Sequence, residues 1–245
     1  MFDSRQELAV LNNVYWYQAM FRAHRLADAF DDLMWSSEAS PPPFHSNLVV
    51  LSPAVDMRRV RERLNTLERT LSAASFSMKD SFASLDLAAF GYEVLFEAKW
   101  IWHEPLDVQT ALKSGDWTAL TSPGELEAWE NAWWGDARNA LAGPATKQFP
   151  SSLLESLHHR FFAKWDGATI VAGAIANRSP GVVGLSNTFR LNAVVFDDWT
   201  GLMQRTSDHF PGVPMVGYER GGALDVAMAA GFVPTGALRI WQRAP

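Results

Sequence analysis

Hydrophobic residues in the first part of the chain recur at the three- and four-residue spacing that is typical of amphipathic helices. Residues 4–33 show this spacing after a capping-box sequence, Ser4-Arg5-Gln6-Glu7, so we expect a helical region that ends before the Pro41–Pro43 run. The apolar stretch 47–53 predicts a short buried strand, and residues 56–73 predict a second amphipathic helix.

From residue 92 onward, apolar runs bounded by turn residues dominate, which is typical of strands. We expect a long strand over residues 92–102 and three strands over residues 161–189, joined by tight turns at Asp166-Gly167 and Ser179-Pro180-Gly181. Predicted helices cover residues 122–134, 152–159, 196–210 and 223–230, and further strands cover residues 213–219 and 233–243.

This order of elements predicts an α+β (mixed α/β) fold, in which helices pack on both faces of a mostly antiparallel sheet. We expect an N-terminal helical and strand-containing extension over residues 1–91 and a main domain over residues 92–245. The tryptophans at positions 129, 133 and 134 have helical spacing, which favours burial in a core or an interface.

Composition and charge narrow the class of function. The 245 residues carry a net charge of −6, which argues against a general nucleic-acid binder. There is no cysteine, so thiol nucleophiles, disulfides and cysteine-bound zinc are excluded. No apolar run approaches the length of about 18 residues that a membrane span needs. Residues 1–20 lack the apolar core of a signal peptide, so we expect a cytoplasmic protein.

Residue spacing disfavours three other kinds of site. The six histidines are scattered and no H-E-x-x-H motif occurs, so we expect no metal site. The segment G-L-S-N-T around Ser186 lacks the second glycine of a nucleophile elbow, which argues against a serine hydrolase. Glutamates interrupt the arginines between residues 58 and 69, so a solvated helix face is favoured over a site for an acidic partner or a phosphate.

Three segments resemble the GCN5-related N-acetyltransferase (GNAT) superfamily: V-P-M-V-G-Y-E (213–219), A-L-D-V-A-M-A-A-G-F (223–232) and G-A-L-R-I-W (236–241). With the order of elements around them, the resemblance covers residues 92–245. It implies a splayed sheet in which acyl-CoA lies in the V-shaped opening between two central strands. Residues 182–189 and 213–219 correspond to those strands.

The pyrophosphate-binding loop of that family, Gln/Arg-x-x-Gly-x-Gly/Ala, corresponds here to residues 189–199, F-R-L-N-A-V-V-F-D-D-W. Arg190 can stand at its first position, but no glycine follows, so the loop is degenerate. Asp197 and Asp198 would repel a pyrophosphate if they lie in the first turn of the next helix, and would leave its backbone donors open if Asn192 caps that helix. The resemblance implies that the cofactor lies beside Leu185, Ser186, Asn187, Thr188, Phe189, Arg190 and Asn192.

Two residues at the end of strand 213–219 are the candidate catalytic groups. The resemblance implies that Glu219 takes the proton of the amine and that Tyr218 donates to the departing thiolate. The competing interpretation is that Glu219 caps the helix that opens at Gly221-Gly222.

We therefore expect an N-acetyltransferase that transfers an acetyl group directly from acetyl-CoA, its co-substrate, to a primary amine of a small molecule or peptide, without a metal. The main alternative is a noncatalytic binding or interaction module on the same fold that has lost the phosphate loop. An unrelated small-molecule binder is a third interpretation. We expect neither a nucleic acid nor a membrane as partner, and a homodimer is compatible with the sequence.

Overall fold

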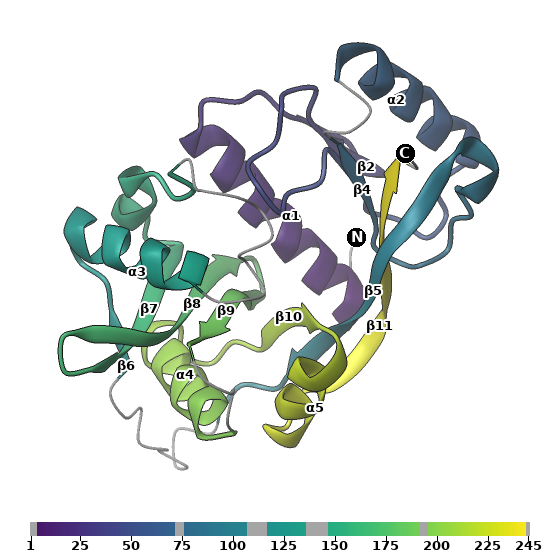
Figure 1. Ribbon diagram of the computed structural model, residues 1–245. Helices are drawn as coiled ribbons and strands as arrows, with labels where there is room; N and C mark the ends of the chain where they lie inside the picture. The colour runs from purple at the N-terminus through teal and green to yellow at the C-terminus, as the bar shows by residue number, and fades with distance from the viewer. Residues whose placement is uncertain (1–3, 72–75, 107–116, 136–146, 192–195, 244–245) are drawn as a thin grey trace. The chain divides into compact units, whose positions relative to one another are not determined.

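The structure is a computed structural model that describes residues 4–71, 76–106, 117–135, 147–191 and 196–243 (Figure 1). Helices and a mostly antiparallel set of strands give the predicted mixed α+β fold. None of the helices within these residues is long and apolar enough to cross a membrane.

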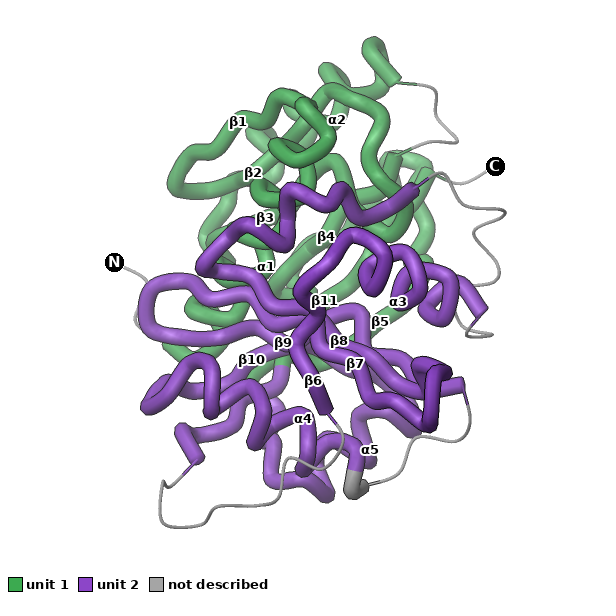
Figure 2. The backbone as a smooth tube through the Cα atoms, turned by 90° about the vertical axis from the view of Figure 1, so that its left-hand side faces the viewer, with its two compact units in different colours: residues 1–100, 235–245 green, residues 101–234 purple. Residues whose placement is uncertain are grey.

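The chain divides into two compact units, which Figure 2 distinguishes by colour. Unit 1 comprises residues 1–100 and 235–245, and unit 2 comprises residues 101–234. The chain passes from unit 1 to unit 2 within strand β5 and returns within strand β11. This grouping differs from the predicted division near residue 91, because β11 pairs with a strand from the first part of the chain.

The sheet of unit 1 has the strand order β1-β2-β3-β4-β11-β5. Strand β11 lies antiparallel beside β4, with Ile240 opposite Lys79, whereas β3 and β4 are parallel. The predicted strand at residues 47–53 is confirmed as β3, and the predicted strands at 92–102 and 233–243 are confirmed as β5 and β11. The strands are β1 (Ala29–Phe30), β2 (Met34–Ser36), β3 (Leu48–Val50), β4 (Ser77–Asp80), β5 (Tyr92–His103) and β11 (Val233–Arg243).

The two helices of unit 1 cover opposite faces of its sheet. Lys79 of β4 donates to Asn13 of α1 (Nζ to Oδ1, 2.7 Å), so this face meets α1. The preceding residue, Met78, packs in the cluster that contains Val60 and Leu64 of α2. Neighbouring residues of a strand point to opposite faces, which places the two helices on opposite sides. The helices are α1 (Arg5–Ala23), α2 (Met57–Thr70) and the 3₁₀ turn η2 (Ala88–Phe90).

Helix α1 begins as predicted and ends earlier than predicted. The capping box between Ser4 and Glu7 is present. The expectation that the helical region continues to residue 33 is wrong, because Arg25 adopts a left-handed conformation with φ of 58°. The N–H of Leu26 then bonds to the carbonyl of Phe21 (2.8 Å), which closes a Schellman-type end. Residues that follow enter β1 and β2.

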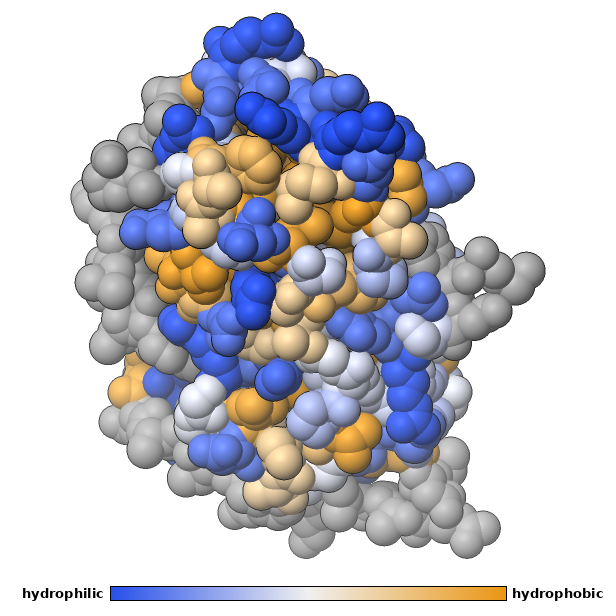
Figure 3. All heavy atoms as spheres, turned by 90° about the vertical axis from the view of Figure 1, so that its right-hand side faces the viewer, coloured by the Kyte–Doolittle hydropathy of each residue, from blue (hydrophilic) through white to orange (hydrophobic). Residues whose placement is uncertain are grey.

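The arginines of α2 form a solvated face, as predicted. Arg58 pairs with Asp56, and Arg59 pairs with Asp31 at 3.3 Å. Figure 3 views the protein from the side on which α2 lies in Figure 1, and hydrophilic side chains gather at the top of this face. With Arg63 beside Glu38, three arginines of this helix pair with carboxylates of the same unit, which offsets part of its positive charge.

The sheet of unit 2 has the strand order β10-β9-β8-β7-β6 and is antiparallel except for the pair β9–β10. The predicted turns are confirmed: Gly167 and Gly181 have φ values of 58° and 84°, a region that glycine enters without steric cost. The strands are β6 (Trp117–Ala119), β7 (His159–Asp166), β8 (Thr169–Ser179), β9 (Val182–Arg190) and β10 (Met215–Glu219).

The helices of unit 2 cover both faces of its sheet, as predicted. On β8, Gly173 faces Trp129 of α3, whereas the next residue, Ala174, packs in a cluster with Leu202 of α4 and Ala227 of α5. The helices predicted at 122–134, 196–210 and 223–230 are present. The one predicted at 152–159 is a short 3₁₀ turn, because strand β7 already begins at His159. The elements are α3 (Pro123–Gly135), η4 (Ser151–Glu155), α4 (Phe196–His209) and α5 (Gly221–Ala229).

Candidate functional site

Strands β9 and β10 run parallel for a short distance and then part. Their register pairs Met215 with Val183 and Val216 with Gly184, although β9 runs on well past these residues. At the next step, a Cβ added to Gly217 would lie 2.9 Å from a backbone carbonyl oxygen of β9. Glycine therefore permits the last close approach of the two backbones, and the opening that the sequence predicts lies beyond it.

A bulge interrupts β9 where the strands part. Gly173 of β8 is opposite Phe189, whereas Ile175 is opposite Ser186, so β9 contains one residue more than β8 over this interval. Asn187 has φ of 51°, a left-handed conformation that asparagine tolerates better than most residues. The extra residue shifts the alternation of β9 by one position.

This shift decides which side chains face α4. Before the bulge, Leu185 belongs to the core cluster under α4 and α5. After it, Phe189 packs edge-on against Trp129 of α3 on the other face, with the ring centroids 5.1 Å apart. Thr188 and Arg190 consequently face the side of α4, where both line a pocket. Without the bulge, strand alternation would place these two polar side chains on the face of α3.

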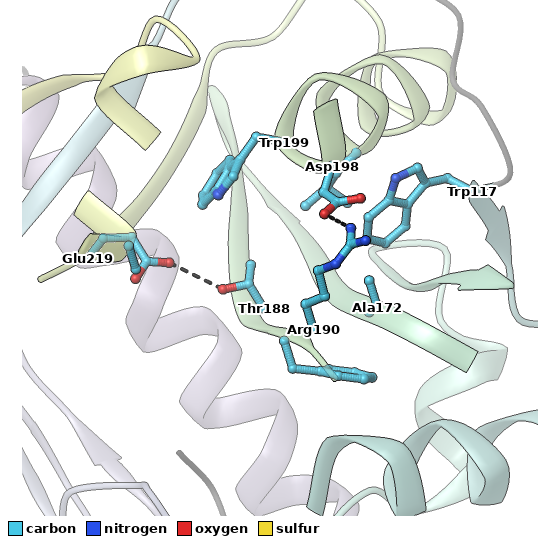
Figure 4. A pocket seen from close by; sticks show the side chains of 11 residues that line it. Trp117, Ala172, Thr188, Arg190, Asp198, Trp199 and Glu219 are labelled. Carbon is cyan, nitrogen blue, oxygen red and sulfur yellow. Dashed lines mark hydrogen bonds and ion pairs between the residues drawn. The ribbon is translucent and has the colours of Figure 1, made fainter. Parts of the chain in front are cut away.

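The pocket lies between the diverging ends of β9 and β10 and the first turns of α4 and α5 (Figure 4). It encloses about 390 Å³, including space that is open to solvent. Its walls combine large aromatic side chains with a few polar groups, which is the usual composition of a small-molecule site. The lining residues are Trp117, Ala172, Gly173, Thr188, Phe189, Arg190, Asp198, Trp199, Leu202, Glu219 and Ala223.

A buried ion network closes one end of the pocket. Asp198 lies in the first turn of α4, and its side chain is 7% exposed. It accepts a bond from Lys164 (Nζ to Oδ1, 3.0 Å) and forms an ion pair with Arg190. The structure thus selects the first of the two placements that the sequence left open, and it supplies two cations that offset the negative charge of this aspartate.

Glu219 lies at the other end of the pocket, and Figure 4 shows it facing Thr188 across the opening. The hydroxyl of Thr188 donates to Oε1 of Glu219 at 3.2 Å. The N-cap of α5 is Arg220, which makes no side-chain capping bond. Glu219 therefore lies one residue before the N-cap of α5, and its carboxylate joins the two strand ends.

The predicted site residues separate into three groups. Glu219, Thr188, Phe189 and Arg190 line the pocket. Four others lie in the described strands without lining it: Leu185 in the core, Asn187 in the bulge, Ser186 with a buried hydroxyl that has no hydrogen-bond partner among the described residues, and Tyr218 on the opposite side of β10 from Glu219. Asn192 lies outside the described residues.

Sequence reasoning missed four residues at or beside the pocket: the lining residues Trp117, Trp199 and Ala172, and Lys164, which pairs with the lining residue Asp198. Three of the four lie on strands whose mutual register no local pattern specifies. Trp199 follows the aspartate pair at the start of α4, and its position there was the only available signal. In the described residues, no group of three or more histidines and carboxylates is placed to hold a metal ion.

Aromatic packing behind the bulge leads to a stability prediction. A Cβ added to Gly173 would lie 2.3 Å from the ring of Phe189 and 2.3 Å from Nε1 of Trp129. Trp129 cannot easily retreat, because its indole N–H donates to the carbonyl of Phe162 at 2.9 Å. We expect Gly173→Ala to lower the free energy of unfolding by about 1–3 kcal/mol in urea denaturation. Gly124→Ala, in a helix with open space around it, is the control and should not destabilise the protein.

Comparisons with known proteins identify the fold. No family model and no curated protein matches the sequence. Among solved structures, the chain is similar to a GCN5-related N-acetyltransferase from Kribbella flavida, with a TM-score of 0.65 and 15% identity over 96% of this chain and 95% of that chain. A second one, from Sphaerobacter thermophilus, has a TM-score of 0.55 and 13% identity over 87% of this chain and 78% of that chain.

A conserved protein of unknown function from Staphylococcus epidermidis has a similar likeness, with a TM-score of 0.64 and 11% identity over 90% of this chain and 95% of that chain. The fold is therefore that of the GNAT acetyltransferases. The likeness extends over the first 90 residues, which the sequence resemblance did not include.

Proposed function

We propose that this chain, which has the fold of the GCN5-related N-acetyltransferases, is an N-acyltransferase that moves an acetyl group from acetyl-CoA to a primary amine. The observation that carries the proposal is the pocket between the parted ends of β9 and β10, with a carboxylate at one end and a cationic network at the other. A thioester with a long polar arm and terminal phosphates fits such a site. Its acyl end needs a base for the attacking amine, and its phosphate end needs cations.

In this proposal, Glu219 is the general base. The amine nitrogen attacks the thioester carbonyl, the C–S bond breaks, and the carboxylate of Glu219 takes the proton that the amine loses. The bond from Thr188 holds this carboxylate at the pocket rim. Tyr218 was predicted to donate to the thiolate, but strand alternation turns it away from Glu219, so we assign no acid to this step.

The donor arm would lie along β9. Thr188 lies on the side of β9 that lines the pocket, just beyond the bulge that redirects the strand. Trp199 and Leu202 supply apolar contacts for the methylene groups of the arm.

A second candidate function is a noncatalytic binding module on the same fold. The absence of glycine after Arg190 favours it, as does the carboxylate of Asp198 at the cationic end. Such a module would retain the pocket and bind a ligand without turnover. Acetyl transfer to an amine distinguishes the two, since only the enzyme consumes acetyl-CoA.

Titration with CoA or acetyl-CoA tests whether the pocket takes the donor at all. A ligand at about 100 times its Kd stabilises a protein by about 2.7 kcal/mol, so we expect a saturable rise in Tm of several degrees. Ala223→Trp, which fills the pocket from α5, should abolish this rise. Ala229→Trp changes an exposed position of the same helix and should preserve it. No response of the parent protein at millimolar CoA would count against the proposal.

A further inference from the structure

Four residues form a row across the sheet of unit 2. Trp117 of β6 is directly opposite Lys164 of β7, Lys164 is opposite Ala172 of β8, and Ala172 is opposite Arg190 of β9. Residues that are directly opposite in neighbouring strands share a face of the sheet. The three long side chains and the methyl group of Ala172 therefore share the face that α4 covers.

The small residue in this row, Ala172, leaves space between the two cations. Ala172 separates the two cations, and its side chain leaves room above the sheet in which both can converge on one anion. Asp198 of α4 occupies that position and pairs with both. Lys164 and Arg190 are only 25% and 20% exposed, so the two cations and the aspartate are held close together with little contact with solvent.

Trp117 adds a donor to this arrangement that the aspartate leaves unused. The residue is 5% exposed and lines the pocket. Its buried Nε1 has no hydrogen-bond partner among the residues that the structure describes. Figure 4 shows its indole extending toward the pair formed by Arg190 and Asp198. A buried indole N–H ordinarily finds an acceptor, so the row has one more donor than Asp198 satisfies.

We propose that Trp117, Lys164 and Arg190 form a phosphate-binding subsite and that Asp198 is its resting counterion. Naming the phosphate as one carried by the acyl donor rests on the proposed function. A phosphate presents three acceptor oxygens where a carboxylate presents two, so it can engage the ammonium, the guanidinium and the indole N–H together. The ligand phosphate therefore competes with Asp198 for the two cations, and the aspartate lowers the affinity of the site.

The subsite is built from side chains on strands β6, β7 and β9. It does not depend on the loop after β9, where the sequence has no glycine. A donor can thus be held by its phosphate although the usual loop pattern is missing.

The first test removes the counterion. Asp198→Asn keeps the shape of the side chain and removes its charge, so we expect the affinity for inorganic pyrophosphate at low salt to rise about tenfold, measured by calorimetry. Asp208→Asn removes the same charge from an exposed position near the other end of α4 and should leave the affinity unchanged. If Asp198→Asn binds inorganic pyrophosphate no more tightly than the parent does, the proposal that Asp198 competes with the phosphate is wrong.

The second test removes donors and remains informative if Asp198→Asn fails to fold. We expect Lys164→Gln to weaken binding of inorganic pyrophosphate about tenfold and Trp117→Phe, which keeps an aromatic ring and loses the N–H, to weaken it several-fold. Lys99→Gln removes a lysine from an exposed strand position of unit 1 and is the control. Unchanged affinity in both subsite variants would refute the subsite.

Comparing CoA with pantetheine, which lacks phosphate, separates this inference from the proposed function. Lys164→Gln should weaken CoA binding about tenfold and leave pantetheine binding unchanged; equal losses for both would show a merely structural role and overturn the assignment. If the parent binds neither thiol but its pyrophosphate affinity responds to the variants as expected, the proposed donor is wrong and the subsite stands.

Discussion

Replacing Glu219 with glutamine lowers the turnover of amine acetylation by about 10²–10⁴-fold if this carboxylate is the general base. Glutamine keeps the size of the side chain and an acceptor for the hydroxyl of Thr188, which now donates to Glu219 at 3.2 Å. The loss should therefore appear in kcat, whereas CoA binding should stay within a factor of about two, since the substitution removes proton transfer rather than a donor contact. Steady-state kinetics with a primary amine and calorimetry with CoA measure the two quantities.

Asp225→Asn is the matched control for this variant. Asp225 is an exposed acidic residue of α5, one turn beyond the helix start. It is not one of the described residues that line the pocket. It should retain full turnover. A Glu219→Gln variant as active as the parent would remove Glu219 from the mechanism, and equal losses in both variants would indicate a general effect of negative charge near α5.

We expect acid to destabilise unit 1 through the buried imidazole of His45. Burial lowers the pKa of His45 to about 4; Lys79 and His24 lower it further, and the carbonyl of Pro43, 2.9 Å from Nδ1, acts in the opposite sense. The unfolded chain, with a pKa of about 6.5, binds the proton first as pH falls. The stability from neutral His45 is thus complete above about pH 6.5 and is lost progressively as pH falls to about 4, by about 3 kcal/mol in total.

Urea denaturation at about pH 7.5 and about pH 4.5 measures this loss, which should reach about 2–3 kcal/mol over that interval. His45→Asn should reduce the pH dependence by most of this amount, because asparagine does not titrate. His158→Asn, at an exposed position, should leave the contribution of His45 intact. Burial also lowers the pKa of His159 in unit 2 to about 4, so the parent should show a second acid-sensitive component that His45→Asn does not remove.

Local signals predicted those elements whose ends are determined by nearby residues. Ser122 and Glu125 cap α3 through reciprocal bonds, so that helix could be located from the sequence. The end of α1 could not, because the left-handed Arg25 is an ordinary residue in an unusual conformation. Short strands such as β4 and β6 depend on partners far along the chain, and no local sequence pattern predicts them.

The candidate site divides in the same way. Glu219 and Arg190 were identified because each ends a strand that the family resemblance locates. Lys164 and Trp117 became visible only with the register that places them opposite each other. The bulge was also hidden, since Asn187 adopts its left-handed conformation without the glycine that would have marked it. The residues at the two ends of the pocket, Glu219 and Arg190, could thus be proposed from the sequence. Lys164 and Trp117 required knowledge of the strand pairing.

The place of β11 in unit 1 has a consequence for how the protein is made. Its residues Arg239–Gln242 pair with β4, at Ser77–Asp80, yet the ribosome synthesises all of unit 2 between these two strands. The continuous segment 101–234 can begin to fold while the chain is still growing, whereas the sheet of unit 1 must wait for a strand translated more than a hundred residues later. Until then β4 has an exposed edge, and chaperone protection of the nascent chain would matter most at that stage.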